Sequence, residues 1–242
     1  MTLIASLEGK DGMVLASDSR GTIGDPRGLT AINDVHKKIF KLCSHCGIAI
    51  AGSSELANQF IDLLNKRIQE NKISDVDHVV NEISTWGKKQ YEEWFGSRPW
   101  VSTAQQGNII DQRPSMIFIV SGYNSNTDKK SRIYLLNNGL DFTPQLCTTG
   151  HMLAGVPQYA TYLIHRLYNP EMKLENIKSL TAYLVTETAT QDPKVGGPLR
   201  MAKITLKDGY AELPNAEIDA ILKKNEEQNI KLREFFFKEQ GK

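Results

Sequence analysis

Cysteine is scarce in this chain, with three residues among 242. That number excludes the dense disulfide framework that holds many small secreted domains together. Cys43 and Cys46 form one C-x-x-C motif, while Cys147 lies far along the chain. A structural zinc site needs about four ligands, and this motif with its internal His45 supplies too few. We therefore expect residues 43–46 to form a polar turn between two strands, with redox or metal chemistry as the alternative.

Excess charge and long apolar runs are also missing. The net charge at pH 7 is +1, so the composition does not favour binding of nucleic acid or of an anionic membrane. No apolar run approaches the ~20 residues of a membrane-spanning helix, and no signal-peptide pattern is recognisable. We expect a cytoplasmic protein without a cofactor or a bound metal. Since 40% of the residues are hydrophobic, one domain over residues 1–242 can bury a sizeable core.

Two hydrophobic patterns succeed each other along the chain. Short apolar runs bounded by turn residues predict strands, and stripes at a spacing of three to four residues predict helices. The expected strands cover residues 2–8, 12–19, 37–43, 47–52, 115–123, 131–137, 142–150, 200–206 and 210–213. The expected helices cover residues 53–70, 74–94, 151–168, 175–190 and a tail from about 214. Residues 21–30 and 96–114 show neither pattern and are expected to be loops.

The order of these elements indicates the fold class. Groups of strands are separated by pairs of helices, and a helix ends the chain. Strands that cluster, rather than alternate singly with helices, favour antiparallel sheets over a doubly wound parallel sheet. The predicted class is α+β, a four-layer αββα sandwich of two antiparallel sheets flanked by helices.

The first forty residues hold the candidate chemistry. Thr2 follows Met1, and threonine is small enough for that methionine to be removed. Removal leaves a hydroxyl and a free α-amine on one residue, and an amine with a pKa near ~7.7–8.0 can accept the hydroxyl proton at neutral pH. Lys38 beside that amine would keep it neutral and stabilise a developing alkoxide. Asp18 would balance the lysine charge, and Arg20 would pair with Asp18 or with another carboxylate.

Each of these features has a simpler explanation on its own. A Met-Thr start is common, and Asp-Ser-Arg at a strand end is usually a turn with a surface salt bridge. Paired lysines usually mark a solvated strand edge. Their order carries the information: a terminal threonine, D-x-R at a strand end, a glycine-rich loop, and then K-K-I-F.

These motifs resemble those of proteasome β-type subunits, which belong to the N-terminal nucleophile hydrolase superfamily. The matching residues are Thr2, Asp18-Ser19-Arg20, Lys38 within KKIF, Ala51-Gly52, and more loosely Thr149-Gly150, Asp192 and Gly196-Gly197. The resemblance implies an αββα fold, peptide cleavage through an acyl-enzyme on the threonine, and assembly into stacked rings. It also implies that the backbone amide of Gly52 lines the oxyanion hole and that Asp192 belongs to the catalytic site.

The chain departs from the family pattern in two places. Gly150-His151 stands where the family usually has Gly-Ser-Gly, and Val195 replaces the serine of D-x-x-S-G-G. Both serines help to position the terminal amine, so their replacement bears on proteolytic efficiency. By resemblance, the pocket for the residue before the scissile bond would be approached by Gly21, His36, Phe40, Ile50 and Ser54. This mixture indicates no cleavage preference.

The leading interpretation is a threonine endopeptidase in a self-compartmentalised homo-oligomeric ring, acting on peptides or unfolded proteins. The loop SRGTIGD is similar to a simpler bacterial branch that works with an ATP-driven unfoldase. Two alternatives stay open: an acyl-threonine transferase or peptide ligase, in which an amine attacks the acyl-enzyme, and a non-catalytic ring subunit. The 96–114 loop and the tail from about 214 are expected to contact neighbouring subunits.

Overall fold

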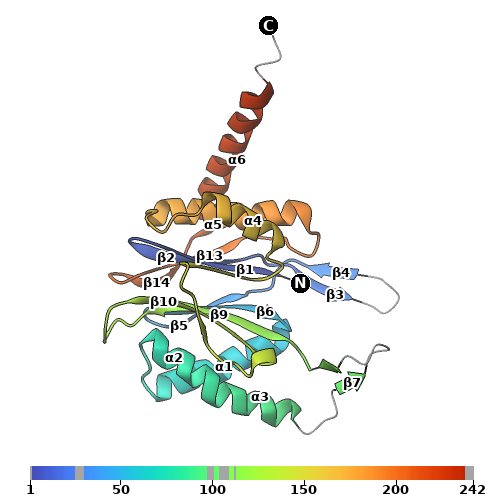
Figure 1. The fold of residues 1–242 in the computed structure, drawn as a ribbon, viewed down its shortest axis with the longest axis vertical. Helices are drawn as coiled ribbons and strands as arrows, with labels where there is room; N and C mark the ends of the chain where they lie inside the picture. Colours follow the sequence, from blue (N-terminus) through green and yellow to red (C-terminus); the bar gives the residue numbers. More distant parts are fainter. Residues whose placement is uncertain (1, 25–29, 97–100, 104–108, 112, 238–242) are drawn as a thin grey trace.

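The computed structural model describes residues 2–24, 30–96, 101–103, 109–111 and 113–237 of the chain. Its body consists of four layers, with two five-stranded antiparallel sheets packed between two layers of helices (Figure 1). This arrangement confirms the predicted α+β class and the αββα sandwich. None of the helices in the described ranges combines the length and the apolar composition that crossing a bilayer requires.

The first sheet is built around the amino-terminal hairpin. Its strands follow the order β12 (His151–Gly155), β1 (Leu3–Gly9), β2 (Gly12–Ser17), β13 (Arg200–Thr205) and β14 (Gly209–Glu212). In the β1–β2 register, Ile4 lies opposite Ser17 and Gly9 lies opposite Gly12. This register brings the residues that follow β2 beside the residues that begin β1, as the predicted hairpin requires.

The second sheet carries the other predicted hairpin. Its strands follow the order β11 (Gln145–Leu146), β10 (Ser131–Asn137), β9 (Met116–Tyr123), β6 (Cys46–Gly52) and β5 (Ile39–Cys43). The two sheets touch mainly through apolar side chains. Among the polar contacts between them, the buried hydroxyls of Ser6 and Ser121 are 2.7 Å apart, and the Ser131 hydroxyl donates to the Glu8 carboxylate.

Helices cover the outer face of each sheet (Figure 1). The second sheet is covered by α1 (Ser54–Glu70) and by a second rod made of α2 (Val76–Glu82), a π-helical turn η1 (Ile83–Gly87) and α3 (Lys88–Phe95). The first sheet is covered by α4 (Gln158–Leu167) and α5 (Leu174–Gln191). Three apolar clusters fill the three spaces between the four layers, which is why strand residues on both faces are buried.

The expected helix over residues 151–168 is wrong in its first third. Residues 151–155 form β12, which pairs with β1 from Leu7 opposite His151 to Leu3 opposite Gly155. Gly155 has a φ of +92°, and Pro157 stands immediately before α4. Both residues oppose a continuous helix through this stretch. The free edge of β1 therefore recruits a strand where the apolar spacing alone predicted a helix.

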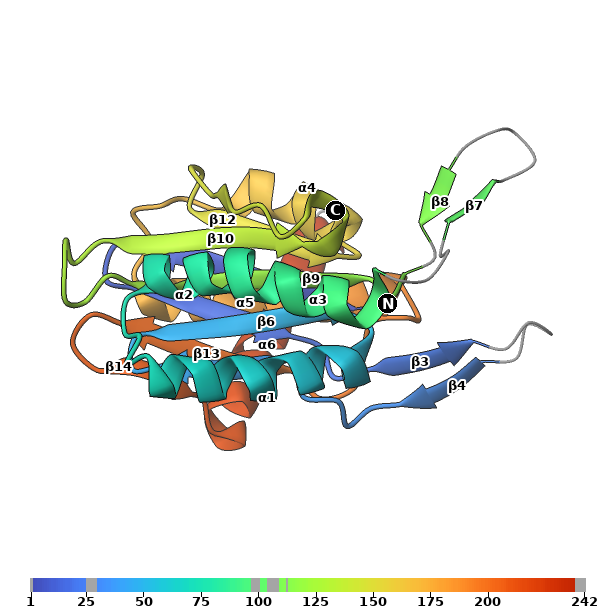
Figure 2. The same ribbon diagram turned by 90° about the horizontal axis from the view of Figure 1, so that it is seen from below.

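Both expected loops contain two-stranded ribbons. β3 (Gly21–Gly24) pairs with β4 (Thr30–Asn33), and β7 (Val101–Thr103) pairs with β8 (Ile109–Asp111). A short 3₁₀ turn, η2 (Asn138–Leu140), follows β10. The two ribbons project from the same end of the sandwich, which is also the end at which the amino terminus lies (Figure 2). The remainder of the 96–114 stretch partly lies outside the described residues.

The predicted helical tail is α6 (Asn215–Phe237), which leaves the α4–α5 layer and projects away from the body (Figure 1). Ile218 is its one fully buried residue in the described part of the chain. Two amides tie its middle to α5, since Asn225 donates to the Ser179 carbonyl at 2.9 Å and Asn229 to the Glu187 carboxylate at 3.3 Å. Beyond these contacts, the last turns expose apolar side chains.

Candidate active site

Four segments meet at the amino-terminal end of β1. They are Thr2, the Asp18–Arg20 turn after β2, Lys38 just before β5, and the junction of β6 with α1. The β1–β2 register sets Asp18 beside Leu3, and the amide of Leu3 donates to Asp18 Oδ1 at 3.2 Å. Thr2, Asp18 and Lys38 therefore lie together, although β5, which follows Lys38, belongs to the second sheet and is not a neighbour of β1 or β2.

Lys38 is the centre of this group. An ammonium carries three donors, and here each of them meets an oxygen: the Thr2 hydroxyl, Asp18 Oδ1 at 2.8 Å and the Arg20 carbonyl at 2.7 Å. The residue is 4% exposed, and Thr2 is 6% exposed. The lysine nitrogen is thus held at the threonine hydroxyl by two other acceptors.

Asp18 is buried and fully used as an acceptor. Besides Lys38 and the Leu3 amide on Oδ1, its Oδ2 accepts from the amides of Arg20 at 3.1 Å and Gly196 at 3.2 Å. Three of these four donors are backbone amides, which fix the position of the carboxylate. Asp18 therefore offers Lys38 a fixed negative partner whose geometry the main chain determines.

Burial is the largest influence on the charge of Lys38. It lowers the pKa of Lys38 below the ordinary lysine value, while the adjacent Asp18 carboxylate opposes that shift. Desolvation disfavours the ammonium because the low-polarity surroundings replace water poorly. The site therefore stabilises the Lys38 ammonium less than water does. Such lowered lysine pKa values are typical of residues that take part in catalysis.

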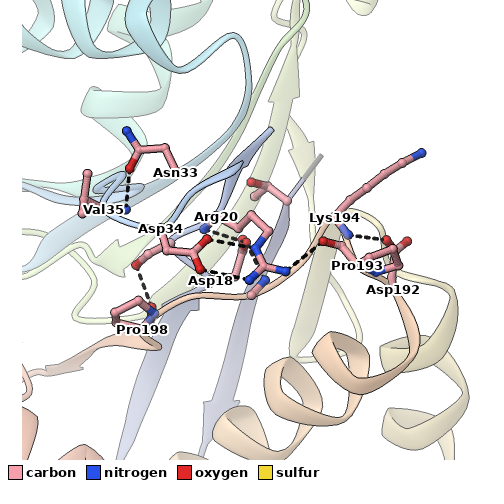
Figure 3. Close-up of polar contacts among 12 residues, drawn as sticks. Asp18, Arg20, Asn33, Asp34, Val35, Asp192, Pro193, Lys194 and Pro198 are labelled. Atoms are coloured by element: carbon pink, nitrogen blue, oxygen red, sulfur yellow. Dashed lines mark hydrogen bonds and ion pairs between the residues drawn. The ribbon is translucent and has the colours of Figure 1, made fainter. Parts of the chain in front are cut away.

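Arg20 pairs with Asp34, a residue that the sequence did not single out (Figure 3). Both contacts of this bidentate pair measure 2.9 Å, and a third guanidinium donor reaches the Pro193 carbonyl at 2.9 Å. The carboxylate of Asp34 raises the pKa of Arg20. Asp18 accepts a hydrogen bond from the backbone amide of Arg20 and not from its guanidinium. The side chain of Arg20 is therefore linked to Thr2 only indirectly.

The glycines after Asp192 fit against this ion pair. A side chain at Gly196 would meet the guanidinium of Arg20, and one at Gly197, where φ is +72°, would meet Asp34. The two glycines allow the chain to pass close to the pair and to deliver the Gly196 amide to Asp18. The Asp192 carboxylate accepts from the Lys194 amide of its own turn at 2.8 Å, and no hydrogen bond joins it to Thr2 in the described ranges.

The main chain of Thr2 is clamped by the end of β12. The Val156 amide donates to the Thr2 carbonyl at 2.9 Å, and the missing side chain of Gly155 leaves room for that carbonyl. His151 lies at the opposite end of β12 from Gly155, beside Tyr168, and so does not take the place of the family's serine at Thr2. Val195 packs into the apolar cluster under α5 and is fully buried.

A small cleft opens beside the Thr2 hydroxyl. It has a volume of about 10 Å³ and is lined by Thr2, Lys38, residues 50–54 and Ala57. That volume admits about one water molecule. Ile50, Gly52 and Ser54 are among the residues that line this cleft, and Gly52 has a φ of +106° just before α1.

The other expected pocket residues divide into two groups. Gly21 and His36 face each other so closely that a side chain at position 21 would overlap the imidazole ring. Phe40 instead packs against the cluster beneath α1, with the Lys37 ammonium 5.4 Å from its ring centre, and it is absent from the lining of the cleft. Gly21, His36 and Phe40 are therefore all absent from the lining of the cleft, in contrast to Ile50, Gly52 and Ser54.

The C-x-x-C motif forms the expected turn, with Cys43 and Cys46 at the ends of β5 and β6 and Ser44-His45 between them. In the part of the chain that the structure describes, no three side chains of His, Cys, Asp or Glu gather in a group that could hold a metal ion.

Sequence comparison supports the resemblance that the motifs carry. Residues 2–90 match a family model described as "Proteasome subunit". The chain is 25% identical to "Proteasome subunit beta" of Methanopyrus kandleri over 218 residues, which cover 87% of this chain and 90% of that protein. It is 26% identical to "Proteasome subunit beta" of Methanosphaera stadtmanae over 216 residues, 88% and 90% of the two chains. A "Proteasome subunit alpha 2" of Haloarcula marismortui is 29% identical over 112 residues, 44% of this chain and 43% of that protein.

Proposed function

We propose that this chain, which resembles proteasome β subunits along nearly its full length, is a threonine-type endopeptidase that becomes active when Met1 is removed. The observation that carries the proposal is the contact of the Lys38 ammonium with both the Thr2 hydroxyl and Asp18. Burying a charged pair costs free energy. A buried pair that also touches a hydroxyl at the start of the chain therefore favours a catalytic role over a structural one.

The proposed first step is an acyl transfer to Thr2. The terminal amine takes the hydroxyl proton, directly or through a water, because its pKa near ~7.7–8.0 leaves a neutral fraction at pH 7 and the Lys38 ammonium increases that fraction. Thr2 Oγ1 then attacks the peptide carbonyl, and the Lys38 ammonium stabilises the charge that develops on that oxygen. The amine passes its proton to the leaving amino group, and an ester remains on Thr2.

The second step is hydrolysis of this ester. Water attacks the ester carbonyl while the terminal amine accepts a proton from it. The bond between the acyl carbon and Thr2 Oγ1 then breaks, Thr2 Oγ1 takes that proton back from the terminal ammonium, and the product acid is released. We assign the oxyanion donor to the backbone amide of Gly52, which its position on the cleft wall supports. Arg20 is proposed as a positioning residue, because it acts on Asp18 through the backbone and through the 192–197 turn. The same proposal includes Asp192, which shapes that turn.

Maturation provides the first test. We expect an intact-mass measurement of the purified chain to show a species lighter than the full sequence by one methionine residue, and peptide hydrolysis to scale with the amount of this species. The reason is that the amide formed with Met1 deprives Thr2 of its basic amine. Full hydrolytic activity in a preparation that keeps Met1 would contradict the proposed mechanism.

Transfer of the acyl group to an amine is the runner-up function. The same acyl-enzyme serves both reactions, and they differ in whether water or an amine attacks it. Adding a peptide with a free amino terminus to the reaction distinguishes them, because a transferase forms a ligated product at the expense of hydrolysis. A non-catalytic subunit is the weaker alternative, since the chain keeps a buried Lys38 and Asp18 against Thr2.

We further propose that the chain acts in the cytoplasm, within a homo-oligomeric ring that admits peptides or unfolded proteins, in some cases from an ATP-dependent unfoldase. No nucleic acid or membrane enters this proposal. The exposed aromatic end of α6 supports contacts between copies, since Phe235, Phe236 and Phe237 are 66%, 67% and 71% exposed. A groove of about 510 Å³ lies where α6 leaves α5, lined in part by Leu180, Tyr183 and Leu232. Contiguous exposed apolar surface of this kind is typical of interaction sites.

Replacing Phe235 and Phe236 together with serine should lower the mass of the assembly in sedimentation or light-scattering measurements. The expected reason is loss of the apolar area that a neighbouring copy would cover. The matched control replaces Lys223 and Glu227, two exposed residues of the same helix, with serine and should leave the assembly unchanged. An unchanged mass for the double phenylalanine variant would exclude α6 as a ring contact.

A further inference from the structure

Cys43 and Cys46 lie directly opposite each other at the closed end of the β5–β6 hairpin. Directly opposed residues of antiparallel strands have Cα atoms ~4.5–5.5 Å apart. Disulfides span Cα separations of ~4.4–6.8 Å. The main chain therefore already holds the two cysteines at a separation that a disulfide accepts.

Both side chains also lie on the same face of the sheet. Cys46 is fully buried in the apolar cluster between the second sheet and α1–α3, and Cys43 packs partly buried against the same cluster. The strand is irregular between Lys41 and Cys43, so that Leu42 has no partner opposite it. This irregularity lets Leu42 and Cys43 both approach the cluster.

The surroundings give the two thiols different characters. The neighbouring Cys46 thiol lowers the pKa of Cys43, and the Cys46 thiol itself donates to the Gly47 carbonyl at 3.9 Å. Burial raises the pKa of Cys46. The Cys43 thiol donates to the Ser74 carbonyl at 3.0 Å, close to the Asp75 carboxylate, which opposes ionisation. Cys43 is thus the more accessible and more readily ionised sulfur, and Cys46 is the shielded one.

We propose that Cys43 and Cys46 form a reversible intramolecular disulfide when the folded chain meets a low-molecular-weight disulfide. This modification site is independent of the proposed peptidase function. The Cys43 thiolate attacks one sulfur of the small disulfide R–S–S–R, whose S–S bond breaks as one R–S⁻ leaves. Cys46 then attacks the Cys43 sulfur of the mixed disulfide and expels the second R–S⁻. The protons of both thiols end on two R–SH molecules, so the chain loses two electrons and the small disulfide gains them.

Cys147 provides an internal control for this chemistry. It is half-buried like Cys43, and its thiol donates to the His151 carbonyl at 3.1 Å. It lies after β11, on the opposite edge of the second sheet from β5. A general oxidant effect would modify Cys147 and Cys43 alike, whereas the proposed reaction joins Cys43 to Cys46 alone.

The test uses the full folded chain treated with oxidised glutathione, then denatured, alkylated and analysed by intact mass and peptide mapping. We expect the alkylatable thiols to fall from three to one, with Cys43 and Cys46 linked, and a thiol reductant to restore all three. Cys147→Ser should still form the link. Cys46→Ser should accumulate a glutathione adduct on Cys43, because the resolving thiol is gone.

Cys43→Ser is the decisive comparison, because the remaining Cys46 is fully buried and should acquire no adduct in the folded chain. Circular dichroism establishes that each variant is folded. Persistence of three free thiols in the treated wild-type chain would overturn the proposal. A link that includes Cys147, or an adduct on Cys46 equal to that on Cys43, would overturn it as well.

Discussion

Replacing Thr2 with alanine is expected to reduce peptide hydrolysis by at least about 10³-fold, to the background left by substrate binding alone. Alanine removes the oxygen that forms the ester, and no other hydroxyl contacts the Lys38 ammonium in the described structure. The main chain of residue 2 is held by the Val156 amide, which the substitution does not touch. The variant should therefore fold and assemble like the parent chain.

Thr2→Ser is the matched control, because it keeps the hydroxyl and the terminal amine. It should retain measurable hydrolysis and form the acyl-enzyme, which intact mass spectrometry detects as an ester adduct. Steady-state hydrolysis of an unstructured peptide separates the three proteins, provided that Met1 is removed from each. Equal rates for Thr2→Ala and the parent chain would refute the assignment of the nucleophile.

Replacing Lys38 with methionine is the second change with a large expected effect. The turnover number should fall by about 10²–10³-fold, because the charge that develops on Thr2 Oγ1 loses its one buried cation. Methionine fills much of the same volume with an apolar chain, so the packing around β5 is largely kept. The rate of hydrolysis at saturating peptide measures the loss.

Stability should respond far less than turnover. Burial lowers the pKa of Lys38, which means that the ammonium is less stable in the folded chain than in the unfolded chain. Asp18 also keeps three backbone donors after the lysine is removed. We expect the free energy of unfolding to change by no more than about 2 kcal/mol, below the range for breaking a buried pair whose charge loses every partner.

Lys37→Met is the control for this experiment. Lys37 is adjacent in sequence but 42% exposed in its side chain, and it pairs with Glu212 at 2.7 Å on the surface. An exposed pair contributes about 0–1 kcal/mol, so this variant should keep both its stability and its turnover. Equal losses in the two variants would show that the effect of Lys38 is not specific to the site.

The pH dependence reports the charge of Lys38 directly. The pKa of Lys38 is lowered, so activity should be lost at alkaline pH with a midpoint below the ordinary lysine pKa of ~10.4. Asp18 raises the pKa of Lys38 within the site, so Asp18→Asn should move this loss to still lower pH. Over the interval between the lowered pKa and ~10.4, the unfolded chain binds a proton that the folded chain has released. The free energy of unfolding should therefore rise with pH there, relative to Lys38→Met.

The hairpins at the start of the chain show how far periodicity alone predicts this fold. Short apolar runs separated by Lys-Asp-Gly or Ser-His-Cys leave little choice but antiparallel pairing, and both hairpins are found. The grouping of strands and helices then predicted the four layers correctly. Residues 151–155 were missed because their apolar spacing fits a helix equally well, and only the open edge of β1 makes them a strand.

The same limit applies to the site. The carboxylate that holds Arg20 is Asp34, and nothing in its local sequence distinguishes it from other loop acids. A search for acidic residues close to Lys38 in the sequence could have suggested Asp34. Whether Asp34 reaches Arg20, however, depends on the path of the β3–β4 ribbon. The contacts of Gly155 and Val156 with the Thr2 carbonyl were not predicted for a similar reason. The family motif matches Gly150-His151, which lies at the other end of β12.

By itself, the sequence determined the layered architecture and singled out Thr2, Asp18 and Lys38 as a candidate group, because strand periodicity and side-chain chemistry are local properties. Tertiary structure decided which oxygen each donor meets, which acid holds Arg20, and that His151 stands far from Thr2. Those outcomes depend on strand register and on edges exposed elsewhere in the fold, and a shift of one residue moves a side chain to the other face of its sheet. Such long-range pairing leaves no mark on the local order of residues.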